Sequence, residues 1–226
     1  MNYAFTNGQI LNGTKDMQIQ TGLCILVRDC KIYDIAKDTA DLDGYKIIDL
    51  QGHYILPGLI NMHVHLAGSG KPQKKQRNNE KLVNTIMGSA LTRAIAYNMV
   101  AGFAKDELLS GVTTIRTVGG LGNFDTRLRD EIEAGTKTGP RILAANRGIS
   151  VPGGHMAGSV AIAAANIDEA LAHLNKCEKE KVDIIKLMIT GGVLDAKEKG
   201  TPGELKMSPD MVRAVCDKAH ADGYMV

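Results

Sequence analysis

From residue 56 to the last residue, short apolar runs alternate with longer segments of helical periodicity, and this alternation is the strongest constraint on the fold. Each apolar run has the length of a strand, and each segment between them can form a helix that crosses back over a sheet. Strands joined in this way lie parallel, with right-handed crossovers. We expect strands at 56–66, 112–118, 141–145 and 182–189, a fifth beginning at 223, and helices at 80–110, 124–135, 167–180 and 209–222.

Two α/β architectures fit this alternation, a doubly wound sheet and a (β/α)8 barrel. A complete barrel takes about 250 residues, whereas residues 56–226 supply four strand–helix units and a fragment. The barrel alternative is therefore half a barrel, and a flavodoxin-like binding domain of this length is the other alternative. The glycines within 119–122 lack the spacing of a GxGxxG or P-loop motif, so we interpret them as a surface turn.

Residues 1–55 have a different character, because they show short strand-like runs and no helical periodicity. Asn7-Gly8 and Asn12-Gly13 are tight-turn signals, and the residues around Asp29 are typical of a hairpin turn. An all-β segment of this size is marginal alone, so we expect it to pack on the next domain or on a missing partner. The predicted domains are therefore 1–55, a small β segment, and 56–226.

Composition excludes several classes of protein. The 27 basic and 25 acidic side chains give a formal charge of +2, and the chain has no Trp and three Phe, which argues against a nucleic-acid partner. No uncharged apolar stretch of about 18 residues exists, and no signal pattern opens the chain, so we expect no membrane span and a cytoplasmic protein. The four cysteines form no CxxC pair and are interpreted as free thiols.

Two histidines stand at the end of the first strand of the alternating region. His63 and His65 are two residues apart, so their side chains point to one side of a strand, about 7 Å apart. Imidazoles in this arrangement can share a metal ion. The carboxyl ends of parallel strands are also where α/β folds place their chemistry. A buried structural histidine next to a loop histidine is the alternative, and we favour a metal site.

Lys186 is unusual because it lies inside an apolar strand. A buried ammonium is costly, and a shifted pKa or a strong partner is the usual outcome. The alternative is a lysine that extends to solvent. His155 lies in the glycine-rich segment 151–158, on the same predicted rim, and is a candidate substrate-binding residue or an ordinary loop histidine.

The other histidines are predicted to be structural. His53 precedes the alternating region, His173 is expected on the solvent side of a charged helix, and His220 suits the C-terminus of a helix. The basic run at 71–77 is expected to be solvated rather than a mobile lid.

The residues LPGLINMHVHL at 56–66, together with the alternation that follows, resemble the amidohydrolase superfamily. More narrowly, they resemble the imidazolonepropionase-like branch with its Xaa-Pro dipeptidases, arginine carboxypeptidases and ochratoxinase-type amidases. The resemblance implies the N-terminal half of a (β/α)8 TIM-type barrel, preceded by half of a β-sandwich. It also implies that His63 and His65 hold one metal and that Lys186, matched by strand order and by Thr190-Gly191-Gly192, is carboxylated by carbon dioxide and bridges to a second. Two divalent ions, of which zinc is the expected kind, would complete such a site.

The resemblance implies hydrolysis of amide or peptide-like C–N bonds, with a small amide or dipeptide as substrate. Family members also use two histidines from later strands and an aspartate as general acid/base, and these are expected beyond the last residue. We therefore predict that the chain is inactive by itself and pairs with a missing C-terminal segment or forms a homo-oligomer. Two alternatives remain, a cyclic-amide hydrolase of the dihydropyrimidinase or imidazolonepropionase kind, and a non-catalytic half-barrel remnant.

Overall fold

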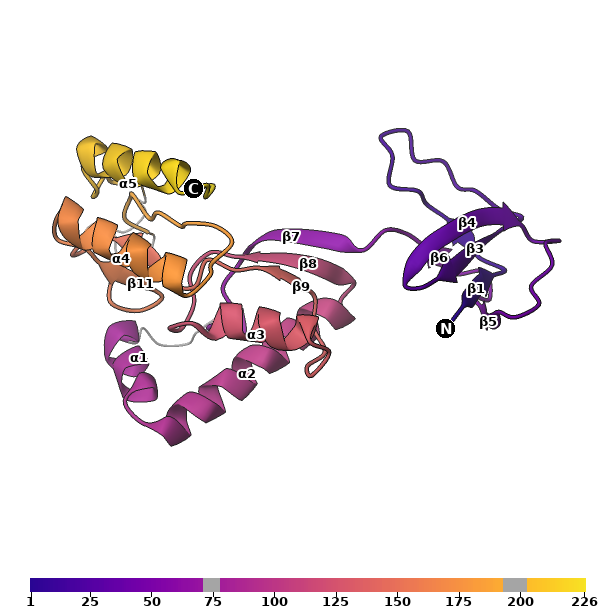
Figure 1. The fold of residues 1–226 in the computed structure, drawn as a ribbon, viewed down its shortest axis with the longest axis horizontal. Coiled ribbons are helices and arrows are strands. Elements are labelled where there is room, and N and C mark those ends of the chain that lie inside the picture. Colours follow the sequence, from indigo (N-terminus) through magenta and orange to yellow (C-terminus); the bar gives the residue numbers. More distant parts are fainter. Residues whose placement is uncertain (71–77, 193–202) are drawn as a thin grey trace. The chain divides into compact units, whose positions relative to one another are not determined.

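The computed structural model describes residues 1–70, 78–192 and 203–226, and the basic run at 71–77 lies outside them. The chain divides into two compact units, Met1–Gly58 and Leu59–Val226 (Figure 1). The first unit contains strands only, and the second contains both strands and helices.

The first unit is built on a four-stranded sheet. Its strand order is β4-β3-β1-β5, with β1 paired antiparallel to β3 and parallel to β5. The hairpin predicted around Asp29 is confirmed: β3 and β4 pair antiparallel, and Asp29 and Cys30 both have positive φ, as a tight hairpin turn requires. A small core of Ala4, Cys24 and Leu26 lies under this sheet. The strands are β1 (Tyr3–Thr6), β3 (Leu23–Arg28), β4 (Lys31–Lys37), β5 (Lys46–Asp49), and the separate parallel pair β2 (Gln9–Ile10) and β6 (Tyr54–Ile55).

The second unit opens with the predicted parallel sheet. Strands β7 (Leu59–Val64), β8 (Val112–Thr117) and β9 (Arg141–Leu143) lie in the order β7-β8-β9, and both pairings are parallel. Helices α2 (Ala90–Leu109) and α3 (Phe124–Glu133) provide the crossovers and bury Tyr97, Val100 and Leu128 against the sheet. The α/β class predicted for this region is therefore confirmed. At one edge of the sheet, β7 exposes Leu59, Ile60 and Met62.

The single helix predicted for 80–110 is wrong, because the structure has two helices there. Helix α1 (Asn79–Met87) ends at Gly88, and α2 begins after Ser89, whose Oγ accepts a hydrogen bond from the backbone N–H of Thr92 at 3.2 Å. Glycine has the lowest helix propensity apart from proline, and serine is a strong N-cap. Together they end one helix and start the next within two residues.

The strand predicted for 182–189 does not form a regular ladder. It makes isolated bridges, from Ile184 to Met225 and from Leu187 to Ile149, so the strand expected to begin at 223 is also reduced to one bridge. Its neighbours differ along its length, since the Asp183 N–H donates to Ala144 O and the Ile149 N–H donates to Lys186 O. An additional parallel pair, β10 (Gly148–Ser150) and β11 (Ala161–Ala163), was not predicted.

Two further helices lie side by side (Figure 1) and close a second apolar core. Helix α4 (Ile167–Lys179) starts at the predicted N-cap: Asn166 Oδ1 accepts from the Glu169 N–H at 2.9 Å. The Glu169 carboxylate accepts from the Ala165 N–H at 2.8 Å, one residue before the N–H that a capping box uses. Helix α5 (Pro209–Ala221) has Ser208 as its N-cap and proline at its first position. No helix in the described ranges is long and apolar enough to span a membrane. All four cysteines are free thiols, as predicted.

Candidate metal centre

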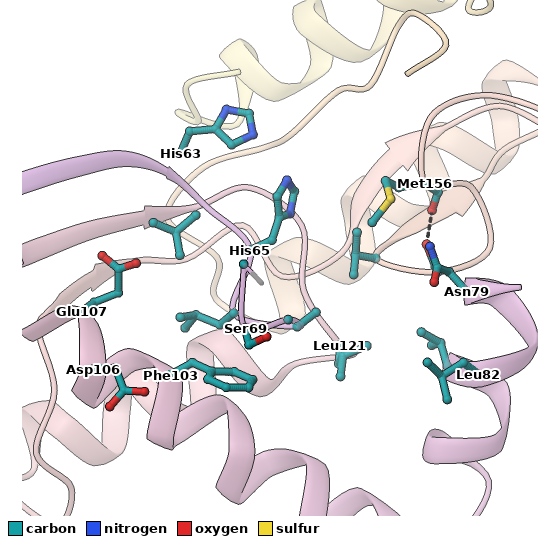
Figure 2. A pocket seen from close by; sticks show the side chains of 18 of the residues that line it. His63, His65, Ser69, Asn79, Leu82, Phe103, Asp106, Glu107, Leu121 and Met156 are labelled. Carbon is teal, nitrogen blue, oxygen red and sulfur yellow. Dashed lines mark hydrogen bonds between the residues drawn. The ribbon is translucent and has the colours of Figure 1, made fainter. Parts of the chain in front are cut away.

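The structure brings the two histidines of the first parallel strand together. His63 lies near the end of β7 and His65 directly follows that strand, and their ring centroids are 5.2 Å apart at an interplanar angle of 68° (Figure 2). The backbone N–H of His63 donates to Asn61 Oδ1 at 3.2 Å. Both rings border a cavity of about 620 Å³ that extends toward α1 and α2.

The tautomer of His65 follows from its hydrogen bond. Its Nδ1 lies 3.0 Å from the carbonyl oxygen of Gly119. A carbonyl oxygen only accepts, so Nδ1 carries the proton and Nε2 keeps its lone pair. Burial lowers the pKa of His65, the bond to Gly119 opposes that shift, and the charges of Lys186 and His155 add to it. His65 is therefore a neutral imidazole with one nitrogen available to a metal ion.

The loop at 119–122, whose Gly119 carbonyl bonds to His65, is largely buried. Its interpretation as a surface turn is therefore wrong. Gly119, Gly120 and Leu121 are all buried. Gly119 has a φ of +140°, and a Cβ there would lie 3.1 Å from Cε1 and Nδ1 of His65 and 3.0 Å from Cε of Met188. Only glycine combines this backbone conformation with such a close approach to a ring. Glycine at this position therefore leaves room for the His65 ring and is not part of an exposed turn.

Lys186 lies half-buried beside His63. Both residues line a second cavity, of about 310 Å³, together with Arg116. Burial lowers the pKa of Lys186, and the charge of Arg116 lowers it further. Gly148 packs against the side chain, since a Cβ at Gly148 would lie 3.2 Å from Lys186 Cγ. The lysine is thus held at the cavity wall with its ammonium form disfavoured.

The side chains that act electrostatically on His63 are all basic. Burial lowers the pKa of His63, and the charges of Lys186, His65, Arg116 and His155 lower it in that order. In the described part of the chain, no three His, Cys, Asp or Glu side chains gather closely enough to hold a metal ion. A metal bound here by this chain would therefore need a ligand atom from Lys186, or ligands from elsewhere, besides the two imidazoles.

His155 is placed between β10 and β11 rather than directly after the third strand. Its backbone N–H donates to Thr190 O at 3.4 Å. Its ring lies against Gly192, where a Cβ would come within 2.0 Å of His155 Nδ1. Its charge also acts on His63 and His65, so the three histidines lie in one region. This arrangement is compatible with a substrate contact near the imidazole pair.

Arg116 and Gly119 were not predicted as site residues from the sequence. Arg116 lies in β8, and its Nε donates to the carbonyl of Met62 in β7 at 2.8 Å. A charged residue inside an apolar strand was the available signal, the same one that identified Lys186. Gly119 gave no such signal, because its role depends on a contact with a residue 54 positions away.

The solvent-facing position predicted for His173 is wrong, while the other two histidines predicted to be structural are exposed. His173 is buried in α4, 8 % exposed, and its Nε2 lies 3.0 Å from Arg147 O. It faces the core because Ala170, Leu174 and Cys177 share that side of the helix. His53 bonds to Leu50 O through Nδ1 at 2.8 Å, and His220 lies in the last turn of α5.

Comparison with known proteins decides the family. The model of the amidohydrolase family matches residues 54–226. The chain belongs to the amidohydrolase family. Members of this family generally use divalent metals, and membership decides against the flavodoxin-like alternative.

Solved amidohydrolases share the fold of this chain. A putative prolidase from Bifidobacterium longum is 33 % identical, with a TM-score of 0.74 over 99 % of this chain and 48 % of its own. A Xaa-Pro dipeptidase with bound methionine is 28 % identical, with a TM-score of 0.75 over 99 % of this chain and 55 % of its own. The chain thus spans about half the length of these solved relatives. The resemblance to this family is confirmed.

A curated relative gives a shorter match. The dihydroorotase of Bacillus cytotoxicus is 41 % identical over 75 residues, which is 33 % of this amidohydrolase and 17 % of the dihydroorotase. The match covers too little of either chain to assign the substrate.

Proposed function

We propose that His63, His65 and Lys186 are metal ligands in a hydrolase that cleaves amide or peptide-like C–N bonds, in the manner of a dipeptidase or carboxypeptidase. The observation that carries this proposal is the tautomer of His65. Its Nδ1–H donates to the carbonyl of Gly119, which leaves Nε2 for a metal ion beside the ring of His63. Imidazole nitrogens suit zinc, and membership of the amidohydrolase family supports a divalent ion.

Lys186 supplies the third ligand as a carbamate. Its neutral amine attacks carbon dioxide, a C–N bond forms, and one proton leaves, which gives an anionic group with two oxygens. Burial and the neighbouring Arg116 favour the neutral amine that this reaction needs. The carbamate also introduces negative charge into a region that otherwise holds Arg116 and three histidines. Two oxygens on one group can serve two metal ions.

Divalent ions held by these groups would lower the pKa of a water molecule and polarise the scissile carbonyl. The chain's own residues prepare the site for them. Gly119 holds the tautomer and direction of the His65 ring, and Lys186 borders the same cavity as His63. His155 lies near both histidines and would bind the substrate, through a carboxylate or the scissile carbonyl.

The fold supports a larger architecture. We propose that β7, β8, β9 and the segment at 182–189 are the first four strands of a (β/α)8 barrel, formed by domain 56–226, and that residues 1–55 are part of a β-sandwich. The general acid/base and the remaining metal ligands would come from a further segment or from a second copy of the chain. The protein is proposed to act in the cytoplasm on a small amide or dipeptide.

A cyclic-amide hydrolase is the second candidate. Its support is the match to dihydroorotase over 75 residues, at 41 % identity. The dipeptidase-like proposal is preferred because the putative prolidase matches 99 % of this chain at 33 % identity.

Metal content per chain tests the proposal first. The purified chain is incubated with zinc and bicarbonate, freed of excess metal, and measured by elemental mass spectrometry. We expect bound zinc in the parent chain, a loss of zinc in His63→Ala and Lys186→Ala, and no loss in His53→Ala, a histidine outside the proposed site. Bicarbonate labelled with ¹³C should give a carbamate signal that Lys186→Ala removes. Equal zinc in all four proteins would refute the assignment of these ligands.

A further inference from the structure

The peptide group between Gly119 and Gly120 is hydrogen-bonded on both sides. Its carbonyl accepts from His65 Nδ1 at 3.0 Å, and its N–H donates to the carbonyl of Asn146 at 2.8 Å. The C=O and N–H of one trans peptide point in opposite directions. This single peptide plane therefore connects a candidate metal ligand to Asn146.

Asn146 is a rigid anchor. It is 1 % exposed and has a φ of +53°, a conformation that asparagine tolerates better than most residues. Its Oδ1 accepts from the Thr126 N–H at 3.1 Å, while its Nδ2 donates to Thr126 Oγ1 at 3.0 Å and to Glu180 Oε2 at 2.9 Å. The side-chain amide uses both its protons and its oxygen, so α3 and the end of α4 hold the Asn146 backbone in place.

The peptide that Asn146 holds would otherwise be free to rotate. Both of its flanking residues are glycines, which give the backbone wide conformational freedom. The fully buried Asp125 limits it from another side, since a Cβ at Gly120 would lie 2.5 Å from Asp125 Oδ2. Packing therefore restricts the loop, while the bond to Asn146 sets the direction of the peptide plane.

The chain of hydrogen bonds follows the order of the sheet. His65 follows β7, the glycine pair follows β8, and Asn146 follows β9, so each link lies past the carboxyl end of one strand. Hydrogen bonds in series strengthen one another in a buried setting. The orientation of the His65 ring thus depends on a residue two strands away.

We propose that Asn146 is a positioning residue for His65. It holds the Gly119–Gly120 peptide so that the Gly119 carbonyl keeps the proton on Nδ1 and directs Nε2 outward as the metal-binding atom. The metal-binding part of this inference rests on the proposed function. The control of the tautomer by Asn146 does not, because it needs no metal.

The test compares Asn146→Gly with the parent chain. Glycine keeps the left-handed backbone and removes all three side-chain bonds. Asn166→Ala is the control, since it removes the N-cap hydrogen bond of α4, which has no bond to the loop. Nitrogen-15 NMR of the histidine rings reports the tautomer of His65 without metal, and titration with Zn²⁺ reports affinity. Thr126→Val, which removes one of the bonds to the Asn146 amide, is a milder second variant.

We expect His65 to change from the Nδ1–H tautomer to a mixture in Asn146→Gly, and the dissociation constant for Zn²⁺ to rise about 10-fold or more, as for other residues that orient metal ligands. Thr126→Val should shift both in the same direction by less, and Asn166→Ala should shift neither. An unchanged tautomer in Asn146→Gly and Thr126→Val would overturn the proposal. If the parent chain binds no Zn²⁺ but the tautomer still changes, the metal site fails and the positioning role stands.

Discussion

Replacing Gly119 with alanine should damage the candidate metal centre more than the fold. The new methyl group would sit 3.1 Å from Cε1 and Nδ1 of His65, tighter than ordinary contact, in a backbone conformation at φ +140° that alanine rarely adopts. The backbone strain costs about 1–3 kcal/mol. If the ring moves away, its bond to the Gly119 carbonyl is lost as well, at about 1 kcal/mol. The free energy of unfolding should therefore fall by about 2–4 kcal/mol.

Gly119→Ala should also lower the affinity of the chain for Zn²⁺. A displaced His65 should weaken Zn²⁺ binding about 10- to 100-fold, the range for lost support of a metal ligand. Gly111→Ala is the control, because Gly111 has a φ of +93° with nothing within 4 Å of its would-be Cβ. Urea unfolding and Zn²⁺ titration are measured for both. If Gly119→Ala binds Zn²⁺ no more weakly than Gly111→Ala does, the steric support of His65 by Gly119 is wrong.

Three further outcomes are expected. Burial raises the pKa of Asp125 to about 6, with the Thr117 hydrogen bond opposing. The folded state therefore holds this proton more tightly than the unfolded state, and the free energy of unfolding should fall by about 2 kcal/mol from pH 4 to pH 7. Asp125→Asn should remove most of that fall in urea unfolding at the two pH values. Asn166→Ala should cost about 1 kcal/mol in the same assay at pH 7, and no change would refute its capping role. Chelation after zinc loading should leave the circular dichroism of the chain unchanged, since none of the three proposed ligands belongs to either apolar core of Leu59–Val226; unfolding would contradict this.

Features that depend on near neighbours in the sequence were predictable. The N-cap of α4 lies within four residues, Asn166 to Glu169, and its hydrogen bond is confirmed at 2.9 Å. The closeness of His63 and His65 follows from the two-residue period of a strand, and their ring centroids are indeed 5.2 Å apart. The parallel sheet was predictable too, because each strand–helix unit is a continuous stretch of sequence whose pattern can be recognised.

Features that depend on distant contacts were not predictable. Gly119 is buried against His65, and nothing within its own loop distinguishes it from a surface turn. The segment at 182–189 has the composition of a core strand, but its neighbours change from Ala144 to Ile149, so no regular ladder forms. His173 looked solvent-facing among charged residues, whereas the apolar stripe of its helix places it inside.

The edge strand β7 has a consequence for the life of this chain in a cell. Among the described strands it pairs with β8 alone, and Leu59, Ile60 and Met62 are 52 %, 62 % and 49 % exposed. An exposed apolar edge of this kind can pair with a strand of another chain until a second neighbour in the proposed barrel covers it. Ribosomes add about 5–20 residues per second, so β7 emerges seconds before the helices that follow β9. A chaperone that binds extended apolar segments would bind this chain at Leu59–Met62. A charged residue in place of Ile60 would weaken that binding.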